Sequence, residues 1–283
     1  MASKYNVEYI AGGATQNSIR VAQLQIPGAT SYIGCIENEK FGEEMKKNSK
    51  LGGVNVHYYK DESAPTGTCV VCVVGGERSL VANLSAANCY KSEHLTRPEN
   101  WALVEKAKYF YIAPFFLTVS IESILLVAEH AAANKKVFMM NLYAPFICEF
   151  FNDALEKILP YMDFVFGNET DARTFSKVRG RETENVEEVA LKISQWPKAS
   201  RTHKRITEIT QGDPVVVADG GKLYFKSIHN HARVVVKVLF ISGNDSSGDL
   251  SSGGSFLEEH QFLLGNSLLI HCLKVDLNIK NPR

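Results

Sequence analysis

The chain has 283 residues, with 31 lysines and arginines against 31 aspartates and glutamates, so its formal net charge is zero. That length can bury a substantial core, as one large α/β domain or two smaller ones. The balanced charge gives no global field for nucleic acid or an anionic membrane, and no apolar stretch approaches the roughly twenty residues that span a bilayer. The start lacks the apolar core of a signal peptide, and six scattered cysteines are typical of reduced thiols. We therefore expect a soluble intracellular protein without nucleic-acid or membrane partners.

Short apolar runs alternate with amphipathic ones through most of the chain. The predicted strands are residues 31–36, 109–112, 136–141, 164–166 and 205–210, and the predicted helices are 40–51, 120–134, 146–158 and 186–195. Ser120 is the natural N-cap of its helix. Such alternation predicts right-handed βαβ units and a mainly parallel sheet with helices on both faces. A sheet of this kind binds ligands beyond the carboxyl ends of its strands.

One region breaks this alternation. Residues 54–59, 69–74 and 79–84 are predicted to be three consecutive short strands, with turns at 65–67 and 75–76. We expect a small antiparallel flap around residues 54–84 that acts as a lid and excludes water from a site beneath it. Residues 1–283 would then form a single domain. The sequence after Gly265 shows no convincing period.

The most informative chemical feature is Gly248-Asp249, which opens a run of small residues. An aspartate just inside a helix N-terminus would lie beside free backbone N–H groups and the positive end of the helix dipole, both of which favour a phosphate. Its carboxylate could accept the proton of an attacking hydroxyl. In isolation, however, an aspartate after a glycine is more often an N-cap or first-turn acid.

Two motifs that could suggest a metal site are weaker signals. Cys69 and Cys72 form a C-x-x-C, but residues i and i+3 of a strand face opposite sides, and no second pair follows at zinc-ribbon spacing. His229 and His231 could share a strand face, yet no third ligand is evident in the sequence. Neither motif predicts a metal site.

Several segments in order resemble the PfkB, or ribokinase-like, family of sugar and nucleoside kinases, and within it the adenosine kinases. They are residues 11–18 (AGGATQNS), 66–69 (TGTC), 78–84 (RSLVANL), 115–120 (FFLTVS), 141–146 (NLYAPF), 166–170 (FGNET), 210–212 (TQG) and 248–254. Several ordered motifs are far more specific than one glycine pattern. The resemblance implies a ribokinase-like fold and transfer of the γ-phosphoryl group of ATP to the 5′-hydroxyl of adenosine, which gives AMP.

The resemblance also implies roles for individual residues. The ribose hydroxyls would be held by Gly13 and Asn17, because only a glycine backbone approaches a sugar closely. Apolar contacts with the nucleoside would come from Cys69, Leu80, Ala82 and Phe115. The ATP phosphates would meet Arg78, Asn168, Thr210, Gly212, Ser247 and Gly248. Asp249 would be the base, and Asp171 would organise Mg²⁺ through water. The implied protein is a monomer of the cytoplasm or nucleus.

Taken singly, these residues have plainer interpretations. Gly12-Gly13 would more often be a turn before a helix, and Arg78 a solvated surface charge. Asn17 would be an ordinary polar residue on an exposed helix face, and Asn168 an N-cap.

The sequence also departs from the family pattern. The family's opening strand, with an aspartate that grips the ribose, has no counterpart, so a neighbouring strand would be left exposed. Asp171 replaces a glutamate, Tyr143 a serine, and two small positions of the anion-hole loop are Ser246 and Ser247. These departures favour an alternative, a catalytically impaired relative that binds nucleoside or other proteins. Asp249, Asn17 and Arg78 favour the active enzyme.

Overall fold

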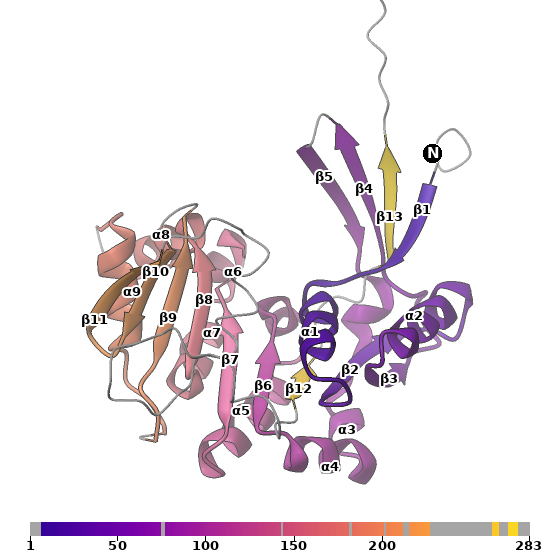
Figure 1. Ribbon diagram of the computed structural model, residues 1–283, viewed down its shortest axis with the longest axis horizontal. Helices are drawn as coiled ribbons and strands as arrows, with labels where there is room; N and C mark the ends of the chain where they lie inside the picture. The colour runs from indigo at the N-terminus through magenta and orange to yellow at the C-terminus, as the bar shows by residue number, and fades with distance from the viewer. Residues whose placement is uncertain are drawn as a thin grey trace, which may run out of the picture.

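The computed structural model describes residues 7–74, 77–142, 144–180, 183–200, 202–211, 215–226, 262–265 and 271–276. They form a nine-stranded sheet with helices on both faces, and a four-stranded sheet that rises from one edge of it (Figure 1). The predicted α/β class and mainly parallel sheet are confirmed. Within these ranges no helix combines the length and hydrophobicity needed to cross a membrane.

The nine-stranded sheet has the order β11-β10-β9-β8-β7-β6-β12-β2-β3. Its strands are β2 (Thr30–Ile36), β3 (Asn55–Lys60), β6 (Tyr109–Ile112), β7 (Val137–Asn141), β8 (Phe164–Asn168), β9 (Ile206–Thr210), β10 (Val215–Asp219), β11 (Lys222–Lys226) and β12 (Phe262–Gly265). Neighbouring strands from β3 to β9 are parallel, and only β10 and β11 join antiparallel. The expectation of an unpaired neighbour to a missing strand is wrong for this sheet, because β12 fills the position between β2 and β6.

The four-stranded sheet has the order β1-β13-β4-β5, from β1 (Val7–Ala11), β13 (His271–Asp276), β4 (Thr68–Val74) and β5 (Glu77–Asn83). The predicted flap is confirmed for β4 and β5, which pair antiparallel. It is wrong for residues 54–59, since β3 pairs parallel with β2 in the larger sheet. The helix α2 (Lys40–Leu51) between these strands explains the difference, because a helical crossover returns the chain in the same direction.

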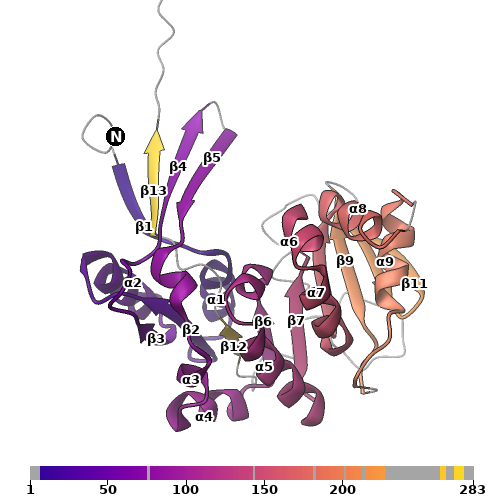
Figure 2. The ribbon, with the colours of Figure 1, turned by 180° about the vertical axis from the view of Figure 1, so that it is seen from behind.

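Helices cover both faces of the larger sheet. On one face lie α1 (Ala14–Gln25) and α2, and on the other the helices and short turns from η2 to α9 (Figures 1 and 2). These are η2 (Ser85–Cys89), α3 (Ser92–Leu95), α4 (Pro98–Lys106), η3 (Pro114–Thr118), α5 (Ile121–Ala133), α6 (Pro145–Phe150), α7 (Asn152–Ile158), η4 (Leu159–Tyr161), α8 (Glu169–Lys177) and α9 (Val186–Ser194). The predicted helix at 146–158 is divided into α6 and α7, and Ser120 caps α5 as expected.

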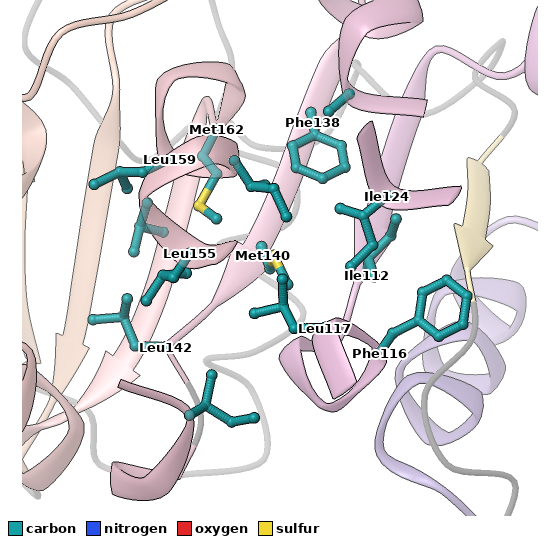
Figure 3. Close-up of a cluster of buried hydrophobic side chains, with 14 of the residues drawn as sticks. Ile112, Phe116, Leu117, Ile124, Phe138, Met140, Leu142, Leu155, Leu159 and Met162 are labelled. Atoms are coloured by element: carbon teal, nitrogen blue, oxygen red, sulfur yellow. The ribbon is translucent and has the colours of Figure 1, made fainter. Parts of the chain in front are cut away.

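The core is built by strands that are buried on both faces. Figure 3 shows Phe138 and Met140 of β7 pointing into one layer of side chains, which includes Ile124 of α5 and Leu155 of α7. The intervening Met139 lies in the opposite cluster, beneath α1 and α2. Two buried faces explain why β7 is a continuous apolar run rather than an alternating one.

A buried arginine contacts several backbone segments beside this core. Arg205, at the start of β9, is only 1% exposed. Its guanidinium donates hydrogen bonds of 2.5–3.3 Å to the carbonyl oxygens of Leu159, Met162, Ile193, Trp196 and Pro197. Burial lowers the pKa of Arg205 to about 10, with Asp163 acting in the opposite direction. The side chain therefore satisfies carbonyl groups within and directly after η4 and α9.

Candidate active site

Three parts of the predicted site lie at one edge of the larger sheet. They are the ends of its parallel strands, the four-stranded sheet and the turn into α1. The strands β6, β7, β8 and β9 are parallel, so their carboxyl ends share this edge. The four-stranded sheet rises from the same edge, and β1 leads at its base into α1 (Figure 1). Ligands of open α/β sheets bind at such an edge.

The turn into α1 has a backbone that requires glycine. Gly13 is the N-cap residue of α1 at φ 115°, a region that residues with a side chain rarely adopt. As a glycine, Gly13 makes no side-chain capping hydrogen bond to the first N–H groups of α1. Asn17 lies exposed in the first turn, and its backbone N–H donates to the Gly13 carbonyl at 2.9 Å.

The strand register brings the predicted apolar contacts together. Cys69 of β4 is opposite Ala82 of β5, and Val71 is opposite Leu80, so Cys69, Ala82 and Leu80 share one face of the four-stranded sheet. Cys69 is buried, whereas Leu80 is 58% exposed. Arg78 lies in the same β5, in register with Val73.

Phe115 lies at the carboxyl end of β6, within η3. Its half-buried ring meets Phe146 of α6 edge to face, with ring centroids 5.2 Å apart and planes at 64°. This pair forms an aromatic surface at the sheet edge, as an apolar floor for a nucleoside would require.

The ends of β8 and β9 place the predicted phosphate residues side by side. Asn168 and Thr210 are register partners, and the Thr210 hydroxyl donates to the Gly167 carbonyl at 3.3 Å. The Asn168 side chain accepts from the backbone N–H of Asp171 at 2.8 Å, and the Asp171 carboxylate accepts from the Asn168 N–H at 3.2 Å. Asn168 is thus the N-cap of α8 in a capping box, which was its plainer interpretation.

Asp171 retains an oxygen that the capping box does not use. The side chain is 2% exposed, and its Oδ1 accepts no hydrogen bond of normal geometry from the described residues. Burial raises the pKa of Asp171. The backbone N–H groups of Asn168 and Ala144 lower it, although the Ala144 contact lacks normal hydrogen-bond geometry. A buried carboxylate oxygen without a partner is where an ordered water or a hydrated cation fits.

Asn141 is a candidate that the sequence analysis did not assign a role. It ends β7, the strand next to β8, and its Oδ1 is buried with no hydrogen-bond partner among the described residues. The signal was present in the sequence, as a polar residue that ends an apolar strand at the carboxyl edge. Its unpaired oxygen, like that of Asp171, occurs at the carboxyl end of the sheet.

Comparison with known proteins shows the family of the chain. The profile of the pfkB family carbohydrate kinases matches residues 3–229. This protein belongs to the PfkB family. Within that family, adenosine kinase 2 of Arabidopsis thaliana is 76% identical over 226 residues, which are 79% of this chain and 66% of the relative. The adenosine kinase of Schizosaccharomyces pombe is 36% identical over 280 residues, which are 95% of this chain and 81% of that relative. This PfkB chain therefore spans just under two thirds of the A. thaliana relative.

Solved structures agree with this family assignment. The Anopheles gambiae adenosine kinase in complex with P1,P4-di(adenosine-5) tetraphosphate has a TM-score of 0.76 and 44% identity, covering 79% of this chain and 67% of that one. The Schistosoma mansoni adenosine kinase in complex with adenosine in an occluded loop conformation has a TM-score of 0.76 and 32% identity, covering 81% and 68%. The ribokinase-like fold inferred from the motifs is confirmed.

Part of the predicted site of this PfkB-family chain lies outside the described residues. These positions are Gly212, Ser247, Gly248 and the proposed base Asp249, as well as Tyr143, which replaces a serine of the family. Their roles stay predictions. The site that can be described consists of the Gly13 turn, the Cys69–Leu80–Ala82 face, Phe115, and the edge formed by Asn141, Asn168, Asp171 and Thr210.

Proposed function

We propose that this chain transfers the γ-phosphoryl group of ATP to the 5′-hydroxyl of adenosine, and so forms AMP in purine salvage. The observation that carries the proposal is the Gly13 turn, an uncapped helix start at the base of the four-stranded sheet, on the same sheet edge as Asn168 and Thr210. The names of the A. thaliana and S. pombe relatives support adenosine as the acceptor. We further propose that the protein acts as a monomer in the cytoplasm or nucleus.

The arrangement suits a reaction that depends on positioning. Phosphoryl transfer requires two substrates held in line and their charge stabilised, with little covalent chemistry from the protein. In this proposal the α1 start and Asn17 hold the ribose. The Cys69–Leu80–Ala82 face covers the adenine ring and excludes water. Arg78 pairs with phosphate oxygens, and Asp249 accepts the proton of the 5′-hydroxyl.

The edge formed by Asn141, Asn168, Asp171 and Thr210 also fits Mg²⁺. Magnesium prefers oxygen ligands and usually keeps several of its waters, binding through one or two carboxylates and substrate phosphates. The unpaired Oδ1 atoms of Asp171 and Asn141 are hard oxygen donors, so they would hold the ion through its waters. When bound, the ion neutralises charge on the transferred phosphoryl group.

A coupled assay for AMP tests the proposal. The wild-type chain should form AMP from adenosine and ATP, and Asp249→Asn should lose turnover by at least about a hundredfold, because general-base catalysis contributes about 10²–10⁴-fold. Adenosine binding, measured by calorimetry, should persist in the variant. Excess ribose should leave the wild-type rate unchanged, whereas competition would indicate a sugar kinase.

The alternative of a catalytically impaired relative makes a different prediction in the same assay. It requires a wild-type rate no higher than that of Asp249→Asn, with adenosine binding intact. One argument for it is the missing opening strand with its aspartate; β12 occupies an interior strand position in the larger sheet, so the part of this argument that remains is the aspartate. The other argument, the serines at 246 and 247, concerns residues outside the described ranges.

A further inference from the structure

Two strands from late in the chain occupy interior positions, β12 in the larger sheet and β13 in the smaller one. In the larger sheet, β12 pairs in parallel with β2 on one side and with β6 on the other. Among the described strands, none pairs β2 directly with β6. The part of the sheet formed by β2 and β3 is therefore joined to the part from β6 to β11 through β12 (Figure 1).

The smaller sheet depends on β13 in the same way. β13 lies between β1, with which it is antiparallel, and β4, with which it is parallel. Among the described strands, β1 has no other partner. The register places His271 beside Ala11, directly before the Gly12-Gly13 turn. The position of that turn therefore depends on β13.

The sequence of both strands suits these interior positions. Phe262, Leu263 and Leu264 form the continuous apolar run that is typical of a strand buried on both faces. Both flanking strands are buried, with Tyr32 of β2 at 0% and Phe110 of β6 at 1% exposure. As sheet edges, such strands would present unpaired backbone groups beside apolar side chains, which favours aggregation.

We propose that residues 262–265 and 271–276, here together named the closing segment, are an essential partner of the rest of this same chain. They complete the larger sheet with β12 and the smaller sheet with β13, and they hold the Gly13 turn through β1. The effect of the Gly13 turn on adenosine binding rests on the proposed function. The completion of the two sheets does not, so it can be tested without any substrate.

Thiol cross-linking tests the register directly. Val275 of β13 is in register with Cys72 of β4, so Val275→Cys places two thiols on one face of adjacent strands. Asp276→Cys is the matched control, because the next residue of a strand faces the other side. Both variants carry Cys272→Ser, since native Cys272 is in register with Cys69. Dibromobimane, which bridges only closely spaced thiols, is the reagent.

We expect a bridge between positions 72 and 275, identified by mass spectrometry of the digested monomer, at a yield at least about five times that of the Asp276→Cys control. Equal yields in the two variants would overturn the proposal. A bridge found only in a covalent dimer would also overturn it, because the closing segment would then come from a second copy of the chain.

Proline substitutions test whether the two sheets need the segment. Leu263→Pro removes a backbone donor from an interior strand and should lower the midpoint of thermal unfolding by at least about 6 °C, whereas Leu263→Val should change it little. An unchanged midpoint in Leu263→Pro would contradict the role of β12.

Leu273→Pro applies the same test to β13. It should weaken adenosine binding at least about tenfold in calorimetry, while Leu273→Val retains wild-type affinity. If Leu273→Pro binds as the wild type does, β13 does not hold the Gly13 turn. If the wild type itself does not bind adenosine, the proposed function fails, and the cross-link and thermal midpoint still decide the closing segment.

Discussion

The two sheets of this protein differ in how they are buried. In β7 of the larger sheet every residue from Val137 to Met140 is at most 8% exposed, because helices cover both faces. In β5 of the smaller sheet, Leu80 is 58% and Val81 71% exposed. The comparison indicates that the larger sheet supplies most of the stability, while the smaller sheet keeps apolar surface available for a ligand.

The sheets also differ in how far apart their paired strands lie in the sequence. From β6 to β9 each strand of the larger sheet pairs with the next one in the chain. In the smaller sheet only β4 and β5 are consecutive, and β1 pairs with β13 from the other end of the described chain. The larger sheet also contains one distant strand, β12, but most of its pairings join consecutive strands, so a smaller share of them requires closing a long loop. We therefore expect the smaller sheet to open more easily.

The largest difference should come from truncating the core of the larger sheet. Phe138→Ala removes a ring that is 0% exposed and should lower the free energy of unfolding by about 3–5 kcal/mol. The control Val81→Ala, on the exposed smaller sheet, should change it by no more than about 0.5 kcal/mol. Urea denaturation measures both. Similar losses in the two variants would contradict the comparison.

A smaller loss is expected from the buried arginine. Arg205→Met keeps most of the apolar volume but leaves carbonyl groups without their donor, so the free energy of unfolding should fall by about 2–4 kcal/mol. Arg173→Met removes an exposed guanidinium that bonds one carbonyl, and should cost less than about 0.5 kcal/mol. If Arg205→Met unfolds at the same urea concentration as Arg173→Met, the carbonyl contacts contribute little.

The smallest effect on stability should occur at the base of the smaller sheet, with a large effect on binding. Gly13→Ala puts a side chain at φ 115° and should cost about 1–2 kcal/mol of unfolding free energy. Adenosine affinity should fall by far more than this loss explains, because the helix start would shift away from the ribose. Gly28→Ala, at φ 78° with open space around it, controls for the backbone cost alone. Equal affinities in the two alanine variants would remove the proposed role of Gly13.

Much of the fold and part of the site could be predicted from local sequence. The apolar runs at 109–112 and 164–166 and the amphipathic run at 40–51 became β6, β8 and α2 with small shifts of boundary. Ser120 was recognised as an N-cap because its hydroxyl acts on residues three positions away. The resemblance implied that Cys69 and Ala82 both contact the nucleoside, and the register of β4 and β5 places them on one face.

Other features were beyond local sequence. The residues of β3 themselves resemble those of the flap strands, and its place beside β2 in the larger sheet depends on the crossover through α2. Asn141 was not assigned a role: the sequence shows that it ends an apolar strand, but its buried Oδ1 without a partner among the described residues is a feature of the tertiary structure. Arg205 gave no sign of burial, because the carbonyl oxygens around it come from separate segments.

The sequence by itself determined the alternation of strands and helices, the N-caps Ser120 and Asn168, and the family, because each depends on residues that are close together or on motifs that keep their order. Only the tertiary structure decided where β12 and β13 lie. Phe262–Gly265 is too short to specify a partner, and its place between β2 and β6 depends on apolar faces and unpaired backbone groups supplied by residues more than a hundred positions away. Burial and hydrogen bonding of distant segments, which no local pattern records, fixed that part of the molecule.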